Sequence, residues 1–260
     1  MGRTNWTGRK RILYLDTEIN YKDWIMEELI KRLQEFAAGD MLDVACGRGD
    51  FLNLAHYFRQ VGKITAIDND PRYKSDIDKI SKDMDIEFKA MDAAEMDFED
   101  ESFDTVVISN SLHHLNNPNT VLKQMRRVLK KGGYFLINEM YDNDLTPAQN
   151  SHNLLHHFVA EINRAQGIVH NSTYKKEKII RLANSIHLSD YEVFDYAWQV
   201  KDVHNPDTIK QIMQRMKSIA NLYQDLDDKK YFSKRQAEIE KYIKKHGYAS
   251  TPSVFIIAKK

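Results

Sequence analysis

The stretch Leu42-Asp-Val-Ala-Cys-Gly-Arg-Gly-Asp50 decides the fold of this chain. It overlaps a short apolar run, Met41 to Ala45, which is typical of a buried strand, and it ends in a glycine-containing turn. Apolar residues then recur at helical spacing and predict a helix that ends near Gly62; they are Phe51, Leu52, Leu54, Ala55 and Phe58. Gly47 and Gly49 allow the backbone to approach a ligand closely, and the following helix would direct its amides at that ligand. The stretch therefore predicts a strand, a ligand-binding turn and a helix.

The ligand expected at this turn is a nucleoside without a pyrophosphate. A dinucleotide-binding turn needs a third glycine three residues after the second, and Leu52 occupies that position. Asp68, which lies 19 residues after Gly49, ends the next strand-like run, 63–67. A carboxylate at this place can accept hydrogen bonds from both hydroxyls of a ribose.

Strand-like and helix-like patterns alternate outward from this stretch. Further strands are expected at 86–90, 103–108 and 134–137, with helices that begin at Pro71 and Pro118. The second half is mainly helical; we expect helices near 146–166, 174–186, 206–222 and 228–246, and strands at 191–196 and 253–258. This order predicts an α/β fold with a mostly parallel sheet, helices on both faces and ligands at the carboxyl ends of the strands.

Composition and charge narrow the class of protein. The 260 residues include 38 Lys and Arg against 38 Asp and Glu, so no overall basic surface indicates nucleic acid, although residues 146–260 carry a net charge of +6. The longest strongly apolar run, Val254 to Ala258, is far shorter than the roughly 20 residues that span a bilayer. No leader or anchor is recognised, and the lone cysteine, Cys46, excludes an internal disulfide, so we expect a cytoplasmic protein without a membrane partner.

Five motifs resemble the class I S-adenosylmethionine-dependent methyltransferases, specifically the small-molecule group that includes the ubiquinone and menaquinone methyltransferases. They occur in the family's order over about residues 38–140, and they are Leu42 to Gly49, Ala66 to Asp68, Ala90 to Ala93, Phe103 to Leu115 and Leu129 to Phe135. The first motif departs from the family at Ala45, where glycine is frequent. The resemblance implies a Rossmann-like sheet of seven strands, mostly parallel, with the last strand antiparallel.

The residue patterns and the resemblance together predict a division of the chain. All 260 residues would form one methyltransferase domain, with an N-terminal helical segment over 1–37 and a cofactor-binding core over 38–140. A helical lid would cover 141–187, and 188–260 would hold the last strands with a helical insertion at 206–247. We expect the first helix of the segment 141–187 to form a lid over the methyl acceptor. The helix is amphipathic, and its apolar stripe consists of Leu154, Leu155, Phe158 and Ile162.

The cofactor implied by the resemblance is S-adenosyl-L-methionine. The residues that would contact it are Asp43, Ala45, Cys46, Gly47, Gly49, Asp68, Asn69, Asp92, Ala93 and Asn110. Asp43 and the backbone of 45–49 would hold the methionine end, and Asn110 would lie beneath it. Asp68 would bind the ribose, with Asn69 beside the adenine. Asp92 would accept a hydrogen bond from the adenine amino group, and the amide of Ala93 would contact the ring.

Catalytic candidates follow the fourth and fifth strands. Methyl transfer is an in-line displacement, in which positioning and exclusion of water can supply most of the acceleration. A base is needed only if the acceptor must lose a proton, and the candidates are His113, His114 and Glu139. The histidines could instead shape the pocket, and Glu139 could instead hold neighbouring loops together.

A second histidine group lies on the helix that begins near Pro147. His152 and His156 are four residues apart and share a helix face, as two metal ligands would, and His157 follows. No complete set of ligands is evident, so we predict no metal; the group could line the substrate pocket or be solvated.

The leading functional hypothesis is methyl transfer from S-adenosylmethionine to a small molecule. One alternative is a methyltransferase acting on tRNA or protein, which the basic second half keeps open although the Asn-Pro-Pro-Tyr type of motif is missing after the fourth strand. A second alternative is a non-catalytic S-adenosylmethionine-binding protein. The acceptor atom and the oligomeric state do not follow from the sequence.

Overall fold

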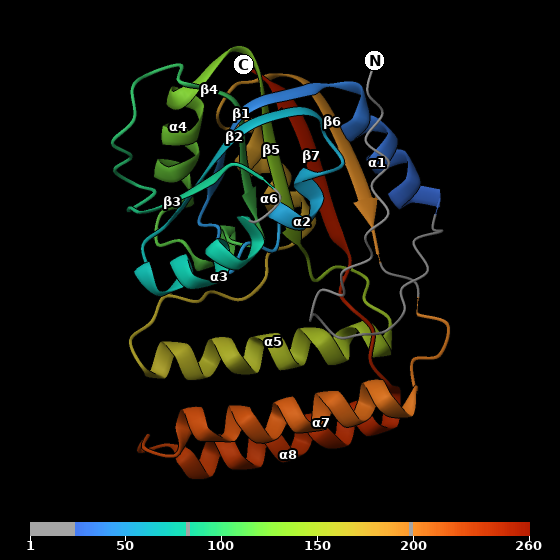
Figure 1. Ribbon diagram of the computed structural model, residues 1–260. Coiled ribbons are helices and arrows are strands. Elements are labelled where there is room, and N and C mark those ends of the chain that lie inside the picture. Colours follow the sequence, from blue (N-terminus) through green and yellow to red (C-terminus); the bar gives the residue numbers. More distant parts are fainter. Residues whose placement is uncertain (1–23, 82–83, 198–199) are drawn as a thin grey trace.

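A computed structural model describes residues 24–81, 84–197 and 200–260 of the chain (Figure 1). The helical segment expected over 1–37 is therefore described only from Trp24, where α1 (Trp24–Glu35) begins, and residues 1–23 lie outside the described part. Helix α1 lies beside the sheet, and Arg32 on it binds Glu192 of β6 through hydrogen bonds of 2.6–3.0 Å.

The centre of the molecule is a sheet with seven strands in the described residues, in the order β3-β2-β1-β4-β5-β7-β6. The strands are β1 (Ala37–Val44), β2 (Arg59–Asp68), β3 (Ile86–Ala90), β4 (Phe103–Ser109), β5 (Leu129–Met140), β6 (Ser189–Tyr196) and β7 (Ser253–Lys259). Strands β1 to β5 pair in parallel, whereas β7 runs antiparallel to both of its neighbours, β5 and β6. The predicted fold class, a mostly parallel Rossmann-like sheet with an antiparallel last strand, is confirmed.

The α-helices described after α1 are α2 (Leu52–Ala55), α3 (Lys74–Ile80), α4 (Pro118–Val128), α5 (Pro147–Ala165), α6 (Lys176–Asn184), α7 (Pro206–Ala220) and α8 (Lys229–His246). Three of these described helices, α4, α5 and α7, begin where the sequence supplies a capping side chain followed by proline. At α5, Thr146 and Gln149 form a reciprocal capping box, and Asn117 and Asn205 cap α4 and α7 in the same position before proline. Within the residues described, none of the helices combines the length and apolarity needed to cross a bilayer.

The helix predicted to run from Phe51 to Gly62 is wrong in its length. Helix α2 is a single turn, Leu52–Ala55, and the chain is already extended at Arg59, which pairs with Ala37 of β1. The buried ring of Phe58 explains the early return, because it packs 5.3 Å from the ring of Phe36, just before β1. One turn of helix offers little dipole, so the glycine turn must bind its ligand through individual groups.

Both faces of the sheet are buried, as expected for parallel strands. One face packs against α4 and α6, with Leu42, Val44 and Ile108 among its core residues. The other face packs near α1, α2 and α3, with Met41 and Val107 in its core. This alternation leaves the strand ends and their loops as the positions where polar side chains gather.

Helices α5, α7 and α8 form a further layer across the carboxyl end of the parallel strands (Figure 1). The layer has a hydrophobic core of its own, which includes Phe158 from α5, Met216 from α7 and Ile239 from α8. The apolar stripe of α5 therefore faces α7 and α8, and the opposite face of α5 is the one directed at the sheet.

Candidate active site

The carboxyl ends of β1 and β2 are joined through Asp68. Its Oδ2 accepts a hydrogen bond of 2.9 Å from the amide of Gly47, and its Oδ1 accepts one of 3.0 Å from the amide of Asp70. The glycine turn after β1 is thus held against the end of β2, where Val44 and Ile67 pair directly. Each carboxylate oxygen can accept a second hydrogen bond, so Asp68 retains capacity for the hydroxyls of a ligand.

Asp43 is a buried acid without a hydrogen-bond partner among the described residues. It is 1% exposed, and neither carboxylate oxygen accepts a hydrogen bond. Burial raises the pKa of its carboxyl group well above the ordinary value, and Asp50 and Asp68 raise it further. A ligand with a positive charge at the end of β1 would provide the missing partner.

The two glycines of the turn differ in their surroundings. Both have positive φ, +52° at Gly47 and +86° at Gly49. A Cβ atom at Gly47 would meet nothing within 4 Å, whereas one at Gly49 would lie 2.8 Å from the Cδ1 atoms of Ile77 and Ile80. Gly47 therefore leaves space for a ligand, and Gly49 permits close packing against α3.

The two residues before Gly47 are Ala45, which has an unusual backbone conformation, and Cys46, which is buried. Ala45 adopts φ of +52°, a left-handed conformation that favours glycine, which is the residue that the resemblance leads one to expect there. Cys46 is buried, and burial together with Asp43 raises the pKa of its thiol far above the ordinary value. The thiol is therefore protonated and packs in the core, which makes it a poor nucleophile.

The residues predicted to surround the adenine follow β2 and β3. Asp92 and Asn69 are exposed, whereas Ala93, the residue after Asp92, is buried. Oδ1 of Asp92 accepts a hydrogen bond of 2.8 Å from the amide of Ala94, which forms a tight turn after β3. After β4, Asn110 has φ of +47° and accepts a hydrogen bond of 3.1 Å from the amide of Met140. The ten residues predicted to bind cofactor thus lie at the carboxyl ends of four neighbouring strands.

His113 and Glu139 form a buried pair beside these loops. His113 lies in a short 3-10 helix, Leu112–His114, after β4, and Glu139 lies near the end of β5. Nδ1 of His113 is 2.6 Å from Oε1 of Glu139, and Oε2 accepts a hydrogen bond of 2.9 Å from the amide of Leu112. The neighbouring Ser111 donates to the carbonyl of Ala45 at 2.9 Å, so the histidine loop is tied to the glycine turn.

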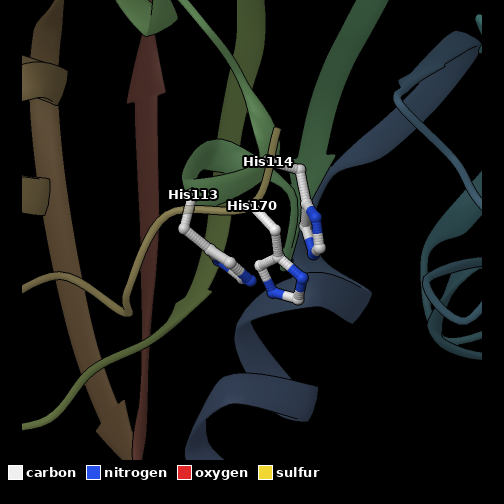
Figure 2. A group of neighbouring side chains, drawn as sticks. All are labelled: His113, His114 and His170. Atoms are coloured by element: carbon white, nitrogen blue, oxygen red, sulfur yellow. The ribbon is translucent and has the colours of Figure 1, made fainter. Parts of the chain in front are cut away.

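Four imidazole rings meet beside this pair. Nε2 of His156, on α5, lies 3.1 Å from Nε2 of His113 and 3.1 Å from Nε2 of His170. The ring of His114 lies beside them, 4.1 Å from the ring of His170 between centroids. Figure 2 shows His113, His114 and His170 with their rings turned toward one another. Sequence reasoning missed His170, which follows α5 in a loop and has no motif around it.

Burial and the neighbouring rings lower the pKa of three of these histidines, which are His114, His156 and His170. Burial lowers the pKa of His156 below the ordinary range, and the neighbouring His113 and His170 lower it further. Burial, His113 and Arg164 lower the pKa of His170 to about 4.

The other two histidines of α5 have structural partners instead. Nδ1 of His152 accepts a hydrogen bond of 3.0 Å from the amide of Thr251, and burial, together with Arg215, lowers its pKa to about 4. Nε2 of His157 lies 2.8 Å from the hydroxyl of Thr173. Of the three histidines predicted on this helix, His156 is the one that joins His113.

The central part of the chain matches a known family of protein domains. Residues 42–137 match the family described as the methyltransferase domain. A demethylmenaquinone methyltransferase of Oceanobacillus iheyensis is 32% identical over 117 residues, which are 44% of this chain and 49% of that protein. A phosphatidylethanolamine N-methyltransferase of Cereibacter sphaeroides is 34% identical over 113 residues, which are 42% of this chain and 54% of that protein. The matched part thus spans about half the length of these curated relatives.

A solved structure extends the likeness of fold to most of the chain. The phosphoethanolamine N-methyltransferase 2 of Haemonchus contortus, in complex with phosphomonomethylethanolamine and S-adenosylhomocysteine, superimposes with a TM-score of 0.55. The superposition covers 91% of this chain and 52% of that one, with 20% identical residues. The resemblance to class I methyltransferases that the motifs indicated is confirmed.

Proposed function

We propose that this chain, which carries the methyltransferase domain in the class I fold, transfers a methyl group from S-adenosylmethionine to a small molecule. The observation that carries the proposal is the arrangement of Asp43, Gly47 and Asp68 around the ends of β1 and β2. An unpartnered buried carboxylate, an open backbone turn and a second carboxylate with spare acceptor capacity fit a nucleoside that bears a positive charge.

Each part of this arrangement would hold one part of the cofactor. Asp43 would face the cationic methionine portion, because a positive charge offsets the cost of its burial. Asp68 would accept hydrogen bonds from the ribose hydroxyls, and Asp92 and Asn69, which are exposed at the next strand ends, would contact the adenine. The cofactor supplies an electrophilic methyl group on a sulfonium.

The loops after β4 and β5 would orient the acceptor. Glu139 binds both the amide of Leu112 and the ring of His113, which makes it a positioning residue for the histidine loop. The layer formed by α5, α7 and α8 covers the same edge of the sheet and would exclude water from the displacement. His113 and His114 would border the acceptor, in agreement with the pocket-shaping role that the sequence left open.

The names of the relatives support a small acceptor. Their names refer to demethylmenaquinone and phosphatidylethanolamine, and the solved structure holds phosphomonomethylethanolamine. The charges of the whole chain balance, which does not favour a nucleic-acid acceptor.

Calorimetry with S-adenosylhomocysteine tests cofactor binding. Asp68→Ala should weaken binding by about 1–3 kcal/mol, because charged hydrogen bonds to the ribose are lost. Asp78→Ala, at an exposed position of α3, is the control and should bind as the unchanged protein does. Binding of NAD with no response to S-adenosylhomocysteine would contradict the cofactor assignment.

Transfer of a labelled methyl group tests the acceptor class. The protein should label a component of a small-molecule extract in the presence of S-adenosylmethionine. Label found only in tRNA or protein, or cofactor binding with no transfer to any of the three fractions, would overturn the small-molecule proposal while leaving the cofactor assignment in place.

A further inference from the structure

We propose that the chain binds a divalent transition-metal ion of the zinc class through the Nε2 atoms of His113, His156 and His170. These residues come from the loop after β4, from α5 and from the loop after α5, and none is among the residues assigned to the cofactor. The proposal revises the prediction of no metal that the sequence suggested.

The contacts of His156 are the first argument. Its Nε2 lies 3.1 Å from the Nε2 atoms of two other rings at once. A ring nitrogen has one in-plane position, which holds either a proton or a lone pair. It therefore cannot make two full hydrogen bonds to the two neighbours, whichever tautomer is chosen. A cation bound by the lone pairs of all three nitrogens accounts for both contacts.

The distances are the second argument. Zinc–nitrogen bonds of roughly 2.0–2.1 Å in a tetrahedral arrangement place two ligand nitrogens about 3.3–3.4 Å apart. The observed 3.1 Å is within a few tenths of an ångström of that spacing. His114 stands beside this set as an alternative donor, because one ring nitrogen from each of His113, His114 and His170 lies within 4.8 Å of the other two.

The partners behind the rings are the third argument. The carboxylate of Glu139 accepts the Nδ1 proton of His113 at 2.6 Å, which leaves the lone pair of the neutral ring on Nε2. Nδ2 of Asn163 lies 2.9 Å from Nδ1 of His170. A turn of this amide by 180° exchanges its nitrogen and oxygen, and the oxygen then accepts the Nδ1 proton in the same way. Carboxylate and amide partners of this kind orient histidines that bind metal.

The backbone of the ligand loops is also fixed. The amide of Asn171 donates to the carbonyl of His113 at 2.8 Å, and the guanidinium of Arg164 donates to the carbonyl of His170 at 2.6 Å. His113 and His170 are both buried, so the site is assembled before an ion arrives. Three protein ligands leave a tetrahedral ion one exchangeable position, as in catalytic zinc sites.

Titration with Co²⁺ tests the site directly. Untagged full-length protein, first treated with a chelator and dialysed, should bind one equivalent of Co²⁺ with visible d–d absorption, and Zn²⁺ should displace it. His156→Ala and His170→Ala should each weaken Co²⁺ binding at least tenfold. Glu139→Gln should weaken it by roughly 10–100-fold, because the carboxylate no longer orients His113. His204→Ala changes an exposed histidine outside the cluster and should leave the affinity unchanged.

Separate measurements keep the test decisive. His156→Gln retains much of the side-chain volume and should lose Co²⁺ binding even if His156→Ala folds poorly. Calorimetry with S-adenosylhomocysteine on the same variants reports whether the cofactor loops remain intact. No stoichiometric Co²⁺ in the unchanged protein, or equal affinity in the His156 and His170 variants, would overturn the proposal. Co²⁺ binding without S-adenosylhomocysteine binding would instead contradict the proposed function alone.

Discussion

Nδ1 of His113 lies 2.6 Å from Oε1 of Glu139, and each side chain is 1% exposed. The second carboxylate oxygen accepts a hydrogen bond from the amide of Leu112, so both oxygens have a donor from the loop after β4. One buried acid on β5 thus fixes the backbone of that loop, the tautomer of its histidine and the direction of Nε2. The role of Glu139 in holding loops together, which the sequence left open beside a role as base, is the one that this geometry favours.

Glu139→Gln should reduce the free energy of unfolding by about 1–3 kcal/mol. An amide presents one acceptor oxygen where the carboxylate presents two, so His113 keeps a partner only in its other tautomer, and both charged hydrogen bonds are lost. Urea denaturation measures the change. The matched control, Glu95→Gln, lies on the exposed surface and should stay within about 0.5 kcal/mol of the unchanged protein. Equal stability of the two variants would show that the pair of His113 and Glu139 contributes nothing to the free energy of unfolding.

Asp43→Asn should stabilise the ligand-free protein increasingly as pH rises. Burial raises the pKa of Asp43 in the folded state above its unfolded value of about 3.9. The folded state therefore holds this proton more tightly, and the stability that protonation contributes is complete below the unfolded pKa and is lost as pH rises through the folded pKa. Asparagine stays neutral and escapes this loss.

Urea denaturation of both proteins at intervals between about pH 5 and about pH 8 measures the effect. The difference in free energy of unfolding should grow with pH in favour of Asp43→Asn, while the affinity for S-adenosylmethionine falls at least tenfold. Asp78→Asn, at an exposed position of α3, is a control for which the affinity should not fall. A difference that does not change with pH would mean that Asp43 is not held in an unfavourable charged state.

Ala45→Gly should raise the free energy of unfolding by about 0.5–1 kcal/mol. Ala45 has φ of +52°, and its carbonyl, which accepts from Ser111, is retained in the variant. Relief of the left-handed strain raises the free energy of unfolding. The greater conformational freedom of glycine in the unfolded chain offsets part of this gain. The same change at Ala237, an exposed position within α8, should instead cost about 1 kcal/mol. A loss of stability at both positions would exclude strain at Ala45.

The parts of the fold that the sequence predicted are those with local causes. Parallel strands buried on both faces appear as apolar runs, and Thr146 or Asn205 before proline marks the start of a helix. The length of α2 depends on Phe58 reaching Phe36, a contact that no local pattern encodes. The packing of α5 on α7 and α8 likewise depends on which of several apolar faces meet in space.

The candidate site was likewise predictable only where its residues follow from local sequence and the order of the strands. Residues at strand ends, such as Asp43 and Asp68, could be placed together because parallel strands share an edge. His170 could not, because its position depends on a helix of 19 residues, about 28 Å long, and on the loop that turns back from it. His156 pairs with a residue 43 positions earlier and another 14 positions later, and neither spacing is a recognised ligand pattern.

Phe158→Ala should destabilise the layer formed by α5, α7 and α8 rather than impair the cofactor site. Phe158 is fully buried, and its ring lies 6.0 Å from that of Tyr223 and 6.3 Å from that of Phe232. The truncated side chain leaves a cavity in this core, with an expected cost of about 3–5 kcal/mol. Native-state hydrogen exchange should therefore show lower protection in α5, α7 and α8 together, while β1 and β4 keep theirs and the affinity for S-adenosylhomocysteine is unchanged. Phe135→Ala, in the core of the sheet, is the matched comparison and should lower protection in the sheet as well. Loss of protection confined to α5 would show that the three helices do not share one cooperative core.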